Sequence, residues 1–388
     1  MGVSLCESYI AKYGPLGSNL DRDGRRREKA DYVRPAVSGL SYDPLKAAFL
    51  EALNLRCLCE RRMNPTITSV AGLEAGHYTD RAHGTGCTVF ICRGGAVGGV
   101  DVRGGSPGTR ETDLLRPVHK VERVHAVLLS GGSAFGLDAA SGVVAYLAER
   151  GIGVTVGPAI VPIVPAAILF DLALLSSEVC PGPKEGRAAC LAASSAPMEE
   201  GSVGAGTGAT VAKARGISAS VKSGIGTAAM KLLDGPMVAA AVAVNAYGGV
   251  FDYRSGLLVA GPRREDGAGF DDPVELVLRG QAGEESGPLA NTTIGVVATD
   301  APLNREEANY LAIVSHDGLA LTIRPCHTMR DGDTMFALAT GRSQRRVDLT
   351  RLGAAAVEVT AQAVLRAVHA ATGLGGIPAL SEVSRGRP

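Results

Sequence analysis

Residues 291–301 read NTTIGVVATDA, and the interpretation of the whole chain starts from this stretch. A polar, glycine-rich segment ends at Asn291, and an apolar strand headed by Thr292 follows it. If the bond between these two residues is cleaved, Thr292 gains a free α-amino group beside its hydroxyl. Such an amine has an ordinary pKa of about 7.7–8.0, so near neutral pH it can accept the hydroxyl proton. The stretch therefore indicates a self-cleaving chain whose mature nucleophile is an N-terminal threonine.

The same dipeptide has simpler interpretations. Asn-Thr pairs are common, and Asn291-Thr292-Thr293 also matches the N-x-[ST] glycosylation pattern, which matters only in a secreted chain. The choice depends on whether other residues of the chain could serve such a nucleophile.

Composition excludes several classes of protein. The chain has 388 residues, 46% of them hydrophobic, and 39 Lys and Arg balance 39 Asp and Glu. This length supports a large core, and the lack of a basic surplus argues against binding to nucleic acid or an anionic membrane. The eight cysteines lack zinc-ligand spacing and are expected to be reduced. The N-terminus lacks the apolar core of a signal peptide, so we expect a cytoplasmic protein.

The first 62 residues differ from the rest. They contain the charge run DRDGRRREK (21–29), and 43–61 has the pattern of an amphipathic helix. We expect 1–62 to be a poorly ordered extension and 63–388 a single catalytic domain, with Met63 a candidate for the true first residue. Residues 151–170 are uncharged and long enough to span a bilayer, but three prolines interrupt any helix there. A buried strand, a turn and a short core segment are expected instead.

From residue 66 onward, strand and helix patterns alternate irregularly. Strands are expected at 87–92 and 96–102, joined as a hairpin through 93–95, and at 124–129, 237–244, 294–298 and 335–339. Helices are expected at about 135–150, from Arg305 with Asn304 and Glu307 forming a capping box, and at 352–371. This pattern favours an α/β fold with layered sheets over an all-parallel doubly wound sheet.

Two polar residues elsewhere could support the threonine. Lys213 follows the glycine-rich run 204–208, and Asn245 ends the strand 237–244, where its amide could donate to a developing oxyanion. The simpler interpretations are a solvated surface lysine and an asparagine that closes a strand at a turn. The glycine run matches the dinucleotide pattern G-x-G-x-x-[GA], but no apolar strand precedes it, so close backbone packing is favoured over NAD binding.

Asp331 and Asp333 precede the strand 335–339. Two carboxylates two residues apart point the same way in an extended chain, so they can share one site. One could orient the amine and hydroxyl of the nucleophile while the other holds a lysine. The ligand spacing of a calcium loop is absent, and a metal site that adds His316 and His327 matches no known motif.

Gly131 and Gly132 lie between an expected strand and an expected helix. The nucleophile-elbow pattern G-x-S-x-G fails here, because Phe135 takes the place of its second glycine. A tight turn that presents backbone N–H groups at a helix N-terminus is favoured, which makes both glycines candidate oxyanion donors.

Taken in order, these motifs resemble the DmpA-type aminopeptidase family, which includes β-peptidyl aminopeptidases and the nylon-oligomer hydrolase. The resemblance covers roughly residues 66–342. Its motifs are GHYTD (76–80), GTGCTV (84–89), DVRGGSPGTRETDLL (101–115), LSGGSAFGLDAASGV (129–143), VPIVPAAILFDL (161–172), GSVGAGTGATVAK (201–213), AVNAYGGVFD (243–252), NTTIGVVATDA (291–301) and RPCHTMRDGDTMFALATG (324–341).

The resemblance implies a four-layer α-β-β-α sandwich with two stacked sheets. It implies self-cleavage into 63–291 (or 1–291) and 292–388, hydrolysis of small peptides or amides with a free amino end, and a homo-oligomer of the processed heterodimers. Carried over by position, Thr292 matches the nucleophile, and Lys213 and Asn245 match residues around the nucleophile and oxyanion of the nylon-hydrolase branch. Asp331 and Asp333 match the acidic pair of that branch.

Three departures leave the substrate open among α-peptides, β-peptides, D-residue amides and synthetic oligomers. Many family peptidases have serine in place of Thr292, a tyrosine of the nylon branch corresponds to Phe170, and residues 1–62 have no family counterpart. The sequence thus predicts a self-processing aminopeptidase or amidohydrolase with an acyl-enzyme on Thr292 and no metal or organic cofactor. An amine-acceptor acyltransferase with the same threonine chemistry and a metal-dependent hydrolase stay as alternatives.

Overall fold

The computed structural model describes residues 65–383, except 234, 268 and 284–290. Residues 63–388 make up one compact unit. The extension expected over 1–62, the helix expected at 43–61 and Met63 lie outside the described residues. Within the described ranges, every helix is too short or too polar to cross a membrane.

A mixed sheet of nine strands runs through this unit. Its strands follow the order β10-β11-β14-β16-β2-β4-β7-β3, and β1 pairs with β2 beside this path. Neighbours are antiparallel except for β14 with β16 and β4 with β7, which are parallel. The bounds in chain order are β1 Glu74–Asp80, β2 Thr85–Val102, β3 Thr109–Arg110, β4 Arg123–Ser130, β7 Ala166–Ile168, β10 Ile225–Lys231, β11 Met237–Asn245, β14 Thr292–Thr299 and β16 Thr334–Ala339.

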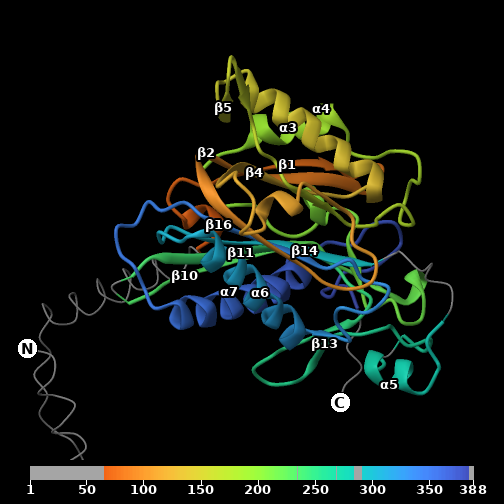
Figure 1. Cartoon of the computed structure of the whole chain (residues 1–388). Coiled ribbons are helices and arrows are strands. Elements are labelled where there is room, and N and C mark those ends of the chain that lie inside the picture. The colour runs from red at the N-terminus through yellow and green to blue at the C-terminus, as the bar shows by residue number, and fades with distance from the viewer. Residues whose placement is uncertain (1–64, 234, 268, 284–290, 384–388) are drawn as a thin grey trace, which may run out of the picture. The chain divides into compact units, whose positions relative to one another are not determined.

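Helices cover both outer faces of the strands, so that four layers stack on one another (Figure 1). On one side, α3 (Ala139–Ala148) and α4 (Pro183–Ala192) pack on β1, β2 and β4. On the other side, α6 (Arg305–Thr322) and α7 (Leu349–His369) pack on β10, β11, β16 and part of β2. Three hydrophobic clusters fill the spaces between these layers, and they include Leu128 and Leu147, then Phe90 and Phe336, then Val242 and Val359.

The α/β class is confirmed, while the expectation of two stacked sheets is corrected to two stacked layers of one sheet. The strand layers are hydrogen-bonded into one sheet because β2 belongs to both. Its first half, Cys87–Ile91, pairs with β4 in one layer, and its second half, Val97–Val102, pairs with β16 in the other.

The hairpin expected around residues 93–95 is wrong for the same reason. Residues 87–102 form one continuous strand, and its register against β4 shifts between Ile91 and Ala96. Gly95 lies in this interval with φ of 70°, a left-handed conformation that glycine adopts without steric cost. The Arg-Gly-Gly sequence therefore bends a long strand from one layer into the next.

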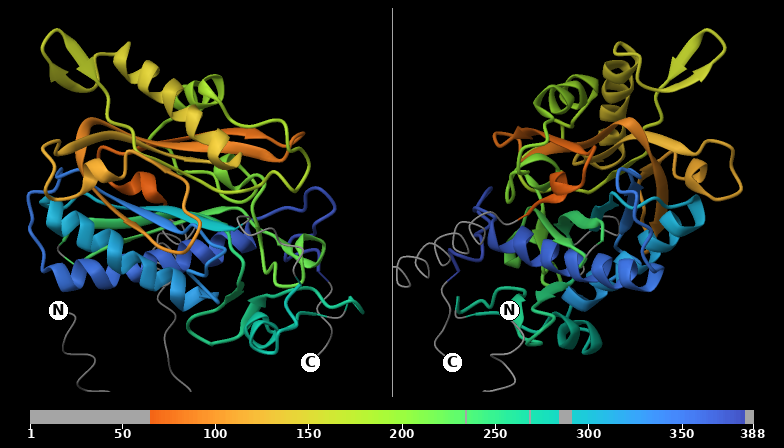
Figure 2. Two further views of the ribbon diagram at one scale, coloured as in Figure 1. Left: turned by 45° about the vertical axis from the view of Figure 1, so that its right-hand side comes forward. Right: turned by 90° about the vertical axis from the view of Figure 1, so that its left-hand side faces the viewer.

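The apolar segment 151–170 is only partly as expected. β7 is buried, but the residues before it form a hairpin of β5 (Val154–Val156) and β6 (Ala159–Val161), which projects from the layers in Figure 2. The expected buried strand is therefore an exposed one, and Val156 is 58% exposed. Pro158 lies in the turn of this hairpin, while Pro162 and Pro165 follow it and lead the chain into β7.

α6 begins where its cap predicts, whereas α7 begins at Leu349, three residues before the expected start. Asn304 Oδ1 accepts from Glu307 N–H at 2.8 Å, and the Glu307 carboxylate accepts from Asn304 N–H at 2.8 Å, so the capping box is confirmed. Asp348 caps α7 by accepting from Arg351 N–H at 3.1 Å. The helix expected at 135–150 is divided between η3 and α3. The remaining elements are η1 Ile67–Ser69, η2 Asp113–Leu115, η3 Ser133–Asp138, η4 Gly204–Gly206, β8 Thr210–Val211, η5 Ile217–Ala219, β9 Val221–Lys222, β12 Gly249–Phe251, β13 Leu258–Ala260, α5 Pro273–Leu278 and β15 Ile323–Arg324.

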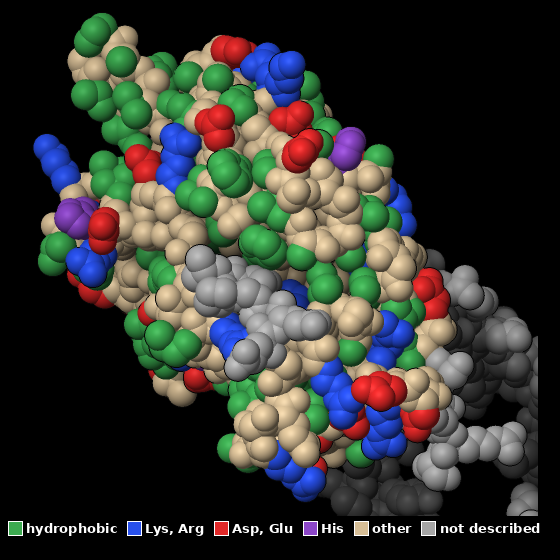
Figure 3. All heavy atoms as spheres, turned by 90° about the vertical axis from the view of Figure 1, so that its right-hand side faces the viewer, with side chains coloured by type: hydrophobic (Ala, Val, Ile, Leu, Met, Phe, Trp, Pro, Cys, Tyr) green, Lys and Arg blue, Asp and Glu red, His purple; other side chains and the backbone are tan. Residues whose placement is uncertain are grey.

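Charges on the surface are mixed in sign. On the face shown in Figure 3, Lys and Arg side chains lie among Asp and Glu side chains. Among the described residues, Asp271 pairs with Arg215 at 2.9 Å and with Arg264 at 3.3 Å.

Candidate functional site

The central strands bring the predicted polar residues to one end of the sheet. Thr292 is the first residue of β14 and lies directly opposite Asn245, the last residue of β11. Asn291 forms an isolated parallel bridge with Asp331, just ahead of the first β14–β16 pair. The end of β11, which is antiparallel to β14, and the start of β16, which is parallel to β14, thus lie on either side of the first residues of β14. Asp333 is the residue before β16.

Thr292 and Asn245 face the interior between the two strand layers. Side chains two residues apart in a strand share a face, and Ile294 and Ala243 belong to the hydrophobic cluster between the layers. Thr292 is 2% exposed. Its hydroxyl is therefore held in a largely dry environment, where hydrogen bonds and charges act more strongly than in water.

The carbonyl oxygen of Asn291 accepts two hydrogen bonds at the bond that was predicted to be cleaved. Thr292 Oγ1 donates one, and the backbone N–H of Gly332 donates the other at 3.1 Å. A hydroxyl in this position is also near the carbonyl carbon, and the N–H donor polarises the C=O bond. The geometry suits attack of Thr292 Oγ1 on the carbonyl of Asn291.

Gly332 was not found from the sequence, because a backbone donor has no side-chain signature. A Cβ at this position would lie 2.2 Å from the carbonyl oxygen of Ser106, so only glycine fits at this position. The sole sequence signal was its place between the two aspartates.

Asp333 links β14 to a histidine. Its Oδ1 accepts from the backbone N–H of Thr293 at 2.6 Å, and its Oδ2 lies 2.7 Å from His327 Nδ1. Asp333 is 1% exposed. Asp333 is therefore a buried acceptor with a polar partner on each oxygen, and it contacts the residue that follows the candidate nucleophile.

Asp331 is held from the other side of the same loop. Its Oδ1 accepts from Tyr247 N–H at 3.2 Å, and its Oδ2 accepts from the N–H of Thr328 at 3.0 Å and from the hydroxyl of that residue. Burial, reinforced by the negative charge of nearby Asp333, raises the pKa of Asp331 to about 6. Two buried carboxylates thus lie next to the Asn291–Thr292 bond, and a cation placed there would be stabilised.

Lys213 is buried and bound to Asn245, so the surface-lysine interpretation is wrong. Its Nζ donates to Asn245 Oδ1 at 2.6 Å and to Asn245 O at 3.1 Å. Burial lowers the pKa of Lys213 to about 7, although the charges of Asp331 and Asp171 act in the opposite direction. The lysine can therefore exchange a proton near neutral pH.

Asn245 connects the two strand layers. Its Oδ1 accepts from Lys213 and from Thr210 N–H at 3.0 Å, and its Nδ2 donates to the carbonyl oxygen of Phe170 at 2.8 Å. These contacts fix the amide plane on the face where Thr292 lies, and they leave the second Nδ2 proton for another acceptor. Phe170, which departs from the nylon-branch tyrosine, contributes its backbone here.

Gly131 and Gly132 do not present free N–H groups. Gly131 N–H donates to Gly86 O at 2.8 Å, and Gly132 N–H donates to Asp171 Oδ1 at 2.7 Å. The predicted oxyanion role is therefore corrected for this arrangement, because both donors are already used. The turn instead holds Asp171, whose pKa burial raises to about 6.

The glycine-rich run 204–208 packs against backbone, as expected. A Cβ on Gly206 would lie 2.1 Å from the backbone nitrogen of Ile225, and one on Gly208 would lie 2.1 Å from Gly84 O. The run forms the short helix η4 and the turn after it, which is not the start of a nucleotide-binding helix.

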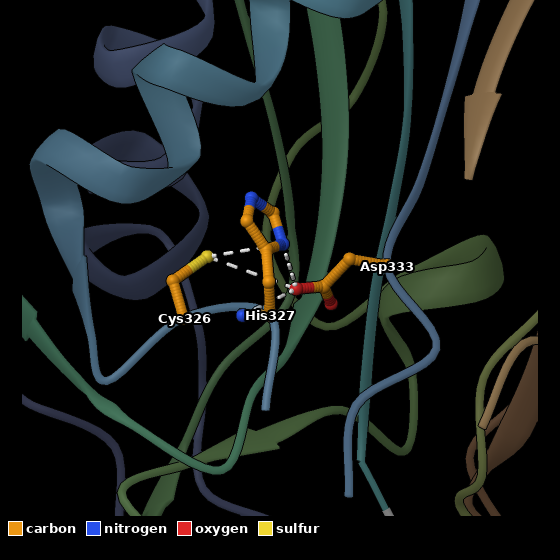
Figure 4. Close-up of side chains that lie close together, drawn as sticks. All are labelled: Cys326, His327 and Asp333. Carbon is orange, nitrogen blue, oxygen red and sulfur yellow. Dashed lines mark hydrogen bonds and ion pairs between the residues drawn. The ribbon is translucent and has the colours of Figure 1, made fainter. Parts of the chain in front are cut away.

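A second polar cluster adjoins Asp333. Cys326 and His327 lie in the loop after β15, and their side chains point toward the Asp333 carboxylate (Figure 4). The ring of His316 lies 4.8 Å from the ring of His327, with the rings nearly perpendicular. His316 belongs to the metal-site alternative weighed from the sequence, and its Nε2 lies 3.1 Å from Asp101 O. Cys326 was missed, because a single cysteine beside a histidine matches no common ligand spacing.

Comparison with known proteins identifies the family. The model of peptidase family S58 matches residues 65–379. The chain belongs to peptidase family S58. It is 43% identical over 343 residues to an uncharacterized aminopeptidase of Mycobacterium leprae (strain TN), covering 81% of this chain and 92% of that one. It is 32% identical over 309 residues to the 6-aminohexanoate-oligomer endohydrolase of Agromyces sp. (strain KY5R), covering 76% and 83%.

Solved structures show the same fold. The L-aminopeptidase D-Ala-esterase/amidase of Ochrobactrum anthropi, described as a variant of the Ntn-hydrolase fold, matches with a TM-score of 0.60 at 20% identity, covering 81% of this S58 chain and 89% of that one. A Burkholderia sp. beta-aminopeptidase matches with a TM-score of 0.57 at 23% identity, covering 84% and 96%. The family resemblance drawn from the sequence motifs is thereby confirmed.

Proposed function

We propose that this S58 member cleaves its own Asn291–Thr292 bond and then acts as an aminopeptidase or amide hydrolase with Thr292 as an N-terminal nucleophile. The observation that carries the proposal is the pair of hydrogen bonds on the Asn291 carbonyl oxygen, from Thr292 Oγ1 and from Gly332 N–H. These contacts support the proposal, because a hydroxyl and a backbone N–H donor meet on the carbonyl oxygen of one peptide bond.

Self-cleavage would proceed by an N→O acyl shift. Thr292 Oγ1 attacks the Asn291 carbonyl carbon while its proton passes to the departing backbone nitrogen, which leaves an ester between the two residues. The developing negative charge lies on the oxygen that Gly332 N–H contacts. Water then hydrolyses the ester and leaves Asn291 as a C-terminal carboxylate and Thr292 as a chain end.

In the processed enzyme, the new α-amine would take the proton of Thr292 Oγ1 as it attacks a substrate amide. The resulting ammonium would lie beside the buried carboxylates of Asp331 and Asp333, which stabilise it. Lys213 and Thr210 hold Asn245, and the second Nδ2 proton of Asn245 is the candidate donor to the substrate oxyanion. Water would release the acyl group, with no metal needed at any step.

The substrate class follows from the relatives. They are named as aminopeptidases and as hydrolases of 6-aminohexanoate oligomers, so small peptides or amides with a free amino end are the proposed substrates. A cytoplasmic location and an assembly of several processed heterodimers remain predictions. A panel of aminoacyl p-nitroanilides of α-, β- and D-residues would identify the preferred class.

The test compares wild type with Thr292→Ala and with Thr293→Ala. Thr292→Ala removes the nucleophile and should remain one full-length chain without activity, by denaturing gel and intact mass. Thr293→Ala is the matched control, because its side chain points to the opposite face and the backbone N–H to Asp333 is kept; it should still be processed. A Thr292→Ala protein that splits at this bond contradicts the proposal.

A further inference from the structure

We propose that Cys326, His327 and Asp333 form a binding site for Zn²⁺, and that the bound ion inhibits the enzyme. The three side chains are called the Cys-His-Asp cluster below. Their candidate ligand atoms all lie within 4.8 Å of one another, and Figure 4 shows them converging on one point. Thiolate, imidazole and carboxylate are the three ligand types that zinc takes in proteins.

The spacing of the donor atoms is close to that of a tetrahedral zinc site. Ligand distances of about 2.3 Å for sulfur and about 2.0–2.1 Å for nitrogen and oxygen place the donors about 3.3–3.6 Å apart. Cys326 Sγ lies 3.4 Å from His327 Nδ1 and 3.7 Å from Asp333 Oδ2, which fits this geometry. The nitrogen and oxygen are 2.7 Å apart and need to separate by roughly half an ångström.

The backbone holds these donors in place. His327 has φ of 55°, a left-handed conformation that is uncommon for a residue with a side chain and that clusters at functional sites. Its own N–H donates to Asp333 Oδ2 at 3.2 Å, which ties the loop to the carboxylate. The His327 side chain is 18% exposed, so an ion can reach the cluster from solvent.

Binding of the ion sets the protonation of two of the ligands. The Cys326 thiol loses its proton to solvent and becomes the thiolate ligand. His327 would bind the ion as a neutral imidazole through Nδ1, with its remaining ring proton on Nε2, and water would take the fourth position on the ion. Nε2 of His327 and Nδ1 of His316 are both buried without a hydrogen-bond partner among the described residues, so the neighbouring ring offers a nitrogen acceptor.

Inhibition follows from the second contact of Asp333. The same carboxylate accepts from Thr293 N–H at 2.6 Å and, in the proposed function, stabilises the ammonium of Thr292. A zinc ion on Oδ2 neutralises the carboxylate and competes with that ammonium. The effect on rate therefore rests on the proposed function, whereas the binding of the ion does not.

Binding is tested on the inactive Thr292→Ala protein, with Co²⁺ as a spectroscopic substitute for Zn²⁺. We expect one equivalent of ion per chain, a thiolate-to-cobalt charge-transfer band, and displacement by Zn²⁺. Cys326→Ser should abolish the band and weaken zinc at least about tenfold. Cys180→Ser removes another partly buried free cysteine and is the matched control, which should leave both unchanged. Equal binding by Cys326→Ser, or no band in Cys180→Ser, overturns the site.

Inhibition is tested on the processed wild-type enzyme. Added Zn²⁺ should lower the rate at least tenfold, a chelator should restore it, and Cys326→Ser should need more zinc for the same fractional loss relative to its own metal-free rate. Zinc that binds without changing the rate overturns the inhibitory role. A rate that rises with zinc and falls with chelator overturns both the inhibitory role and the metal-free function. If every sample is inactive but cobalt still binds, the result counts against the proposed function alone.

Discussion

Two buried lysines show how different roles arise from the same side chain. Lys213 contacts the side chain of Asn245, which pairs with Thr292 of β14. Lys222 donates to the backbone carbonyls of Gly206, Ala209 and Ser223, and so ties the glycine-rich run to β9. Burial lowers the pKa of each lysine to about 7. Both groups therefore couple folding to pH, but only the first lies against the proposed reaction.

Lys222 carries a prediction about stability. Its pKa falls from 10.5 to about 7 on folding, so between these values the unfolded chain holds the proton and the folded chain does not. Stability should therefore rise with pH across this window, by at most about 1.4 kcal/mol per pH unit for one such group. In the unprocessed Thr292→Ala background, Lys222→Met should reduce this slope in urea unfolding. An unchanged slope would show that Lys222 stays protonated in the folded state.

Elements were predictable where apolar runs were clear. The strands β4, β11, β14 and β16 were expected from such runs, and α6 from its cap. β2 was misjudged, because Arg93-Gly94-Gly95 between two apolar runs has the composition of a turn, and the pairing that keeps it extended comes from β4 and β16. Local composition cannot report contacts with strands that are distant in the sequence.

The candidate site was predictable in its side chains and not in its backbone. The sequence motifs contain Thr292, Lys213, Asn245 and the two aspartates, and the strand order brings these residues together. The backbone groups of the site are the donor Gly332 N–H and the acceptor Phe170 O. Their positions depend on the paths of loops, and the type of side chain at these residues does not reveal those paths. The error over Gly131 and Gly132 has the same cause, since their N–H groups face partners that the sequence does not reveal.

The capping box of α6 carries a prediction at the scale of an element. Replacing Asn304 with Ala removes the acceptor for Glu307 N–H and should cost about 1 kcal/mol of stability. Asn304→Asp, which keeps an acceptor oxygen at the N-terminus of the helix, should retain most of it. Urea unfolding of the two variants in the Thr292→Ala background measures the difference, and equal losses would contradict the capping role. Self-processing of the Thr292-containing forms should be unaffected, because the cap is remote from the scissile bond.

At the scale of the molecule, the proposed cleavage divides the chain without dividing its core. Residues 292–388 contribute β14, α6, β16 and α7, while β2 and β11 precede the cleavage site. β14 is hydrogen-bonded to β11, and β16 to β2. The cluster that includes Val242 and Val359 also takes side chains from both parts. Neither part can expose its share of this core to water without losing the hydrophobic stabilisation of the fold.

The two products of cleavage should therefore remain one particle. Wild type and Thr292→Ala are expected to elute at the same position in gel filtration and to give the same native mass apart from the added water of hydrolysis. Under denaturing conditions, wild type should separate into a chain ending at Asn291 and a chain beginning at Thr292, while the variant stays intact. If the products separate in native buffer, the shared strands and core do not keep the two parts associated. The intact covalent bond would then be the only link between them before cleavage.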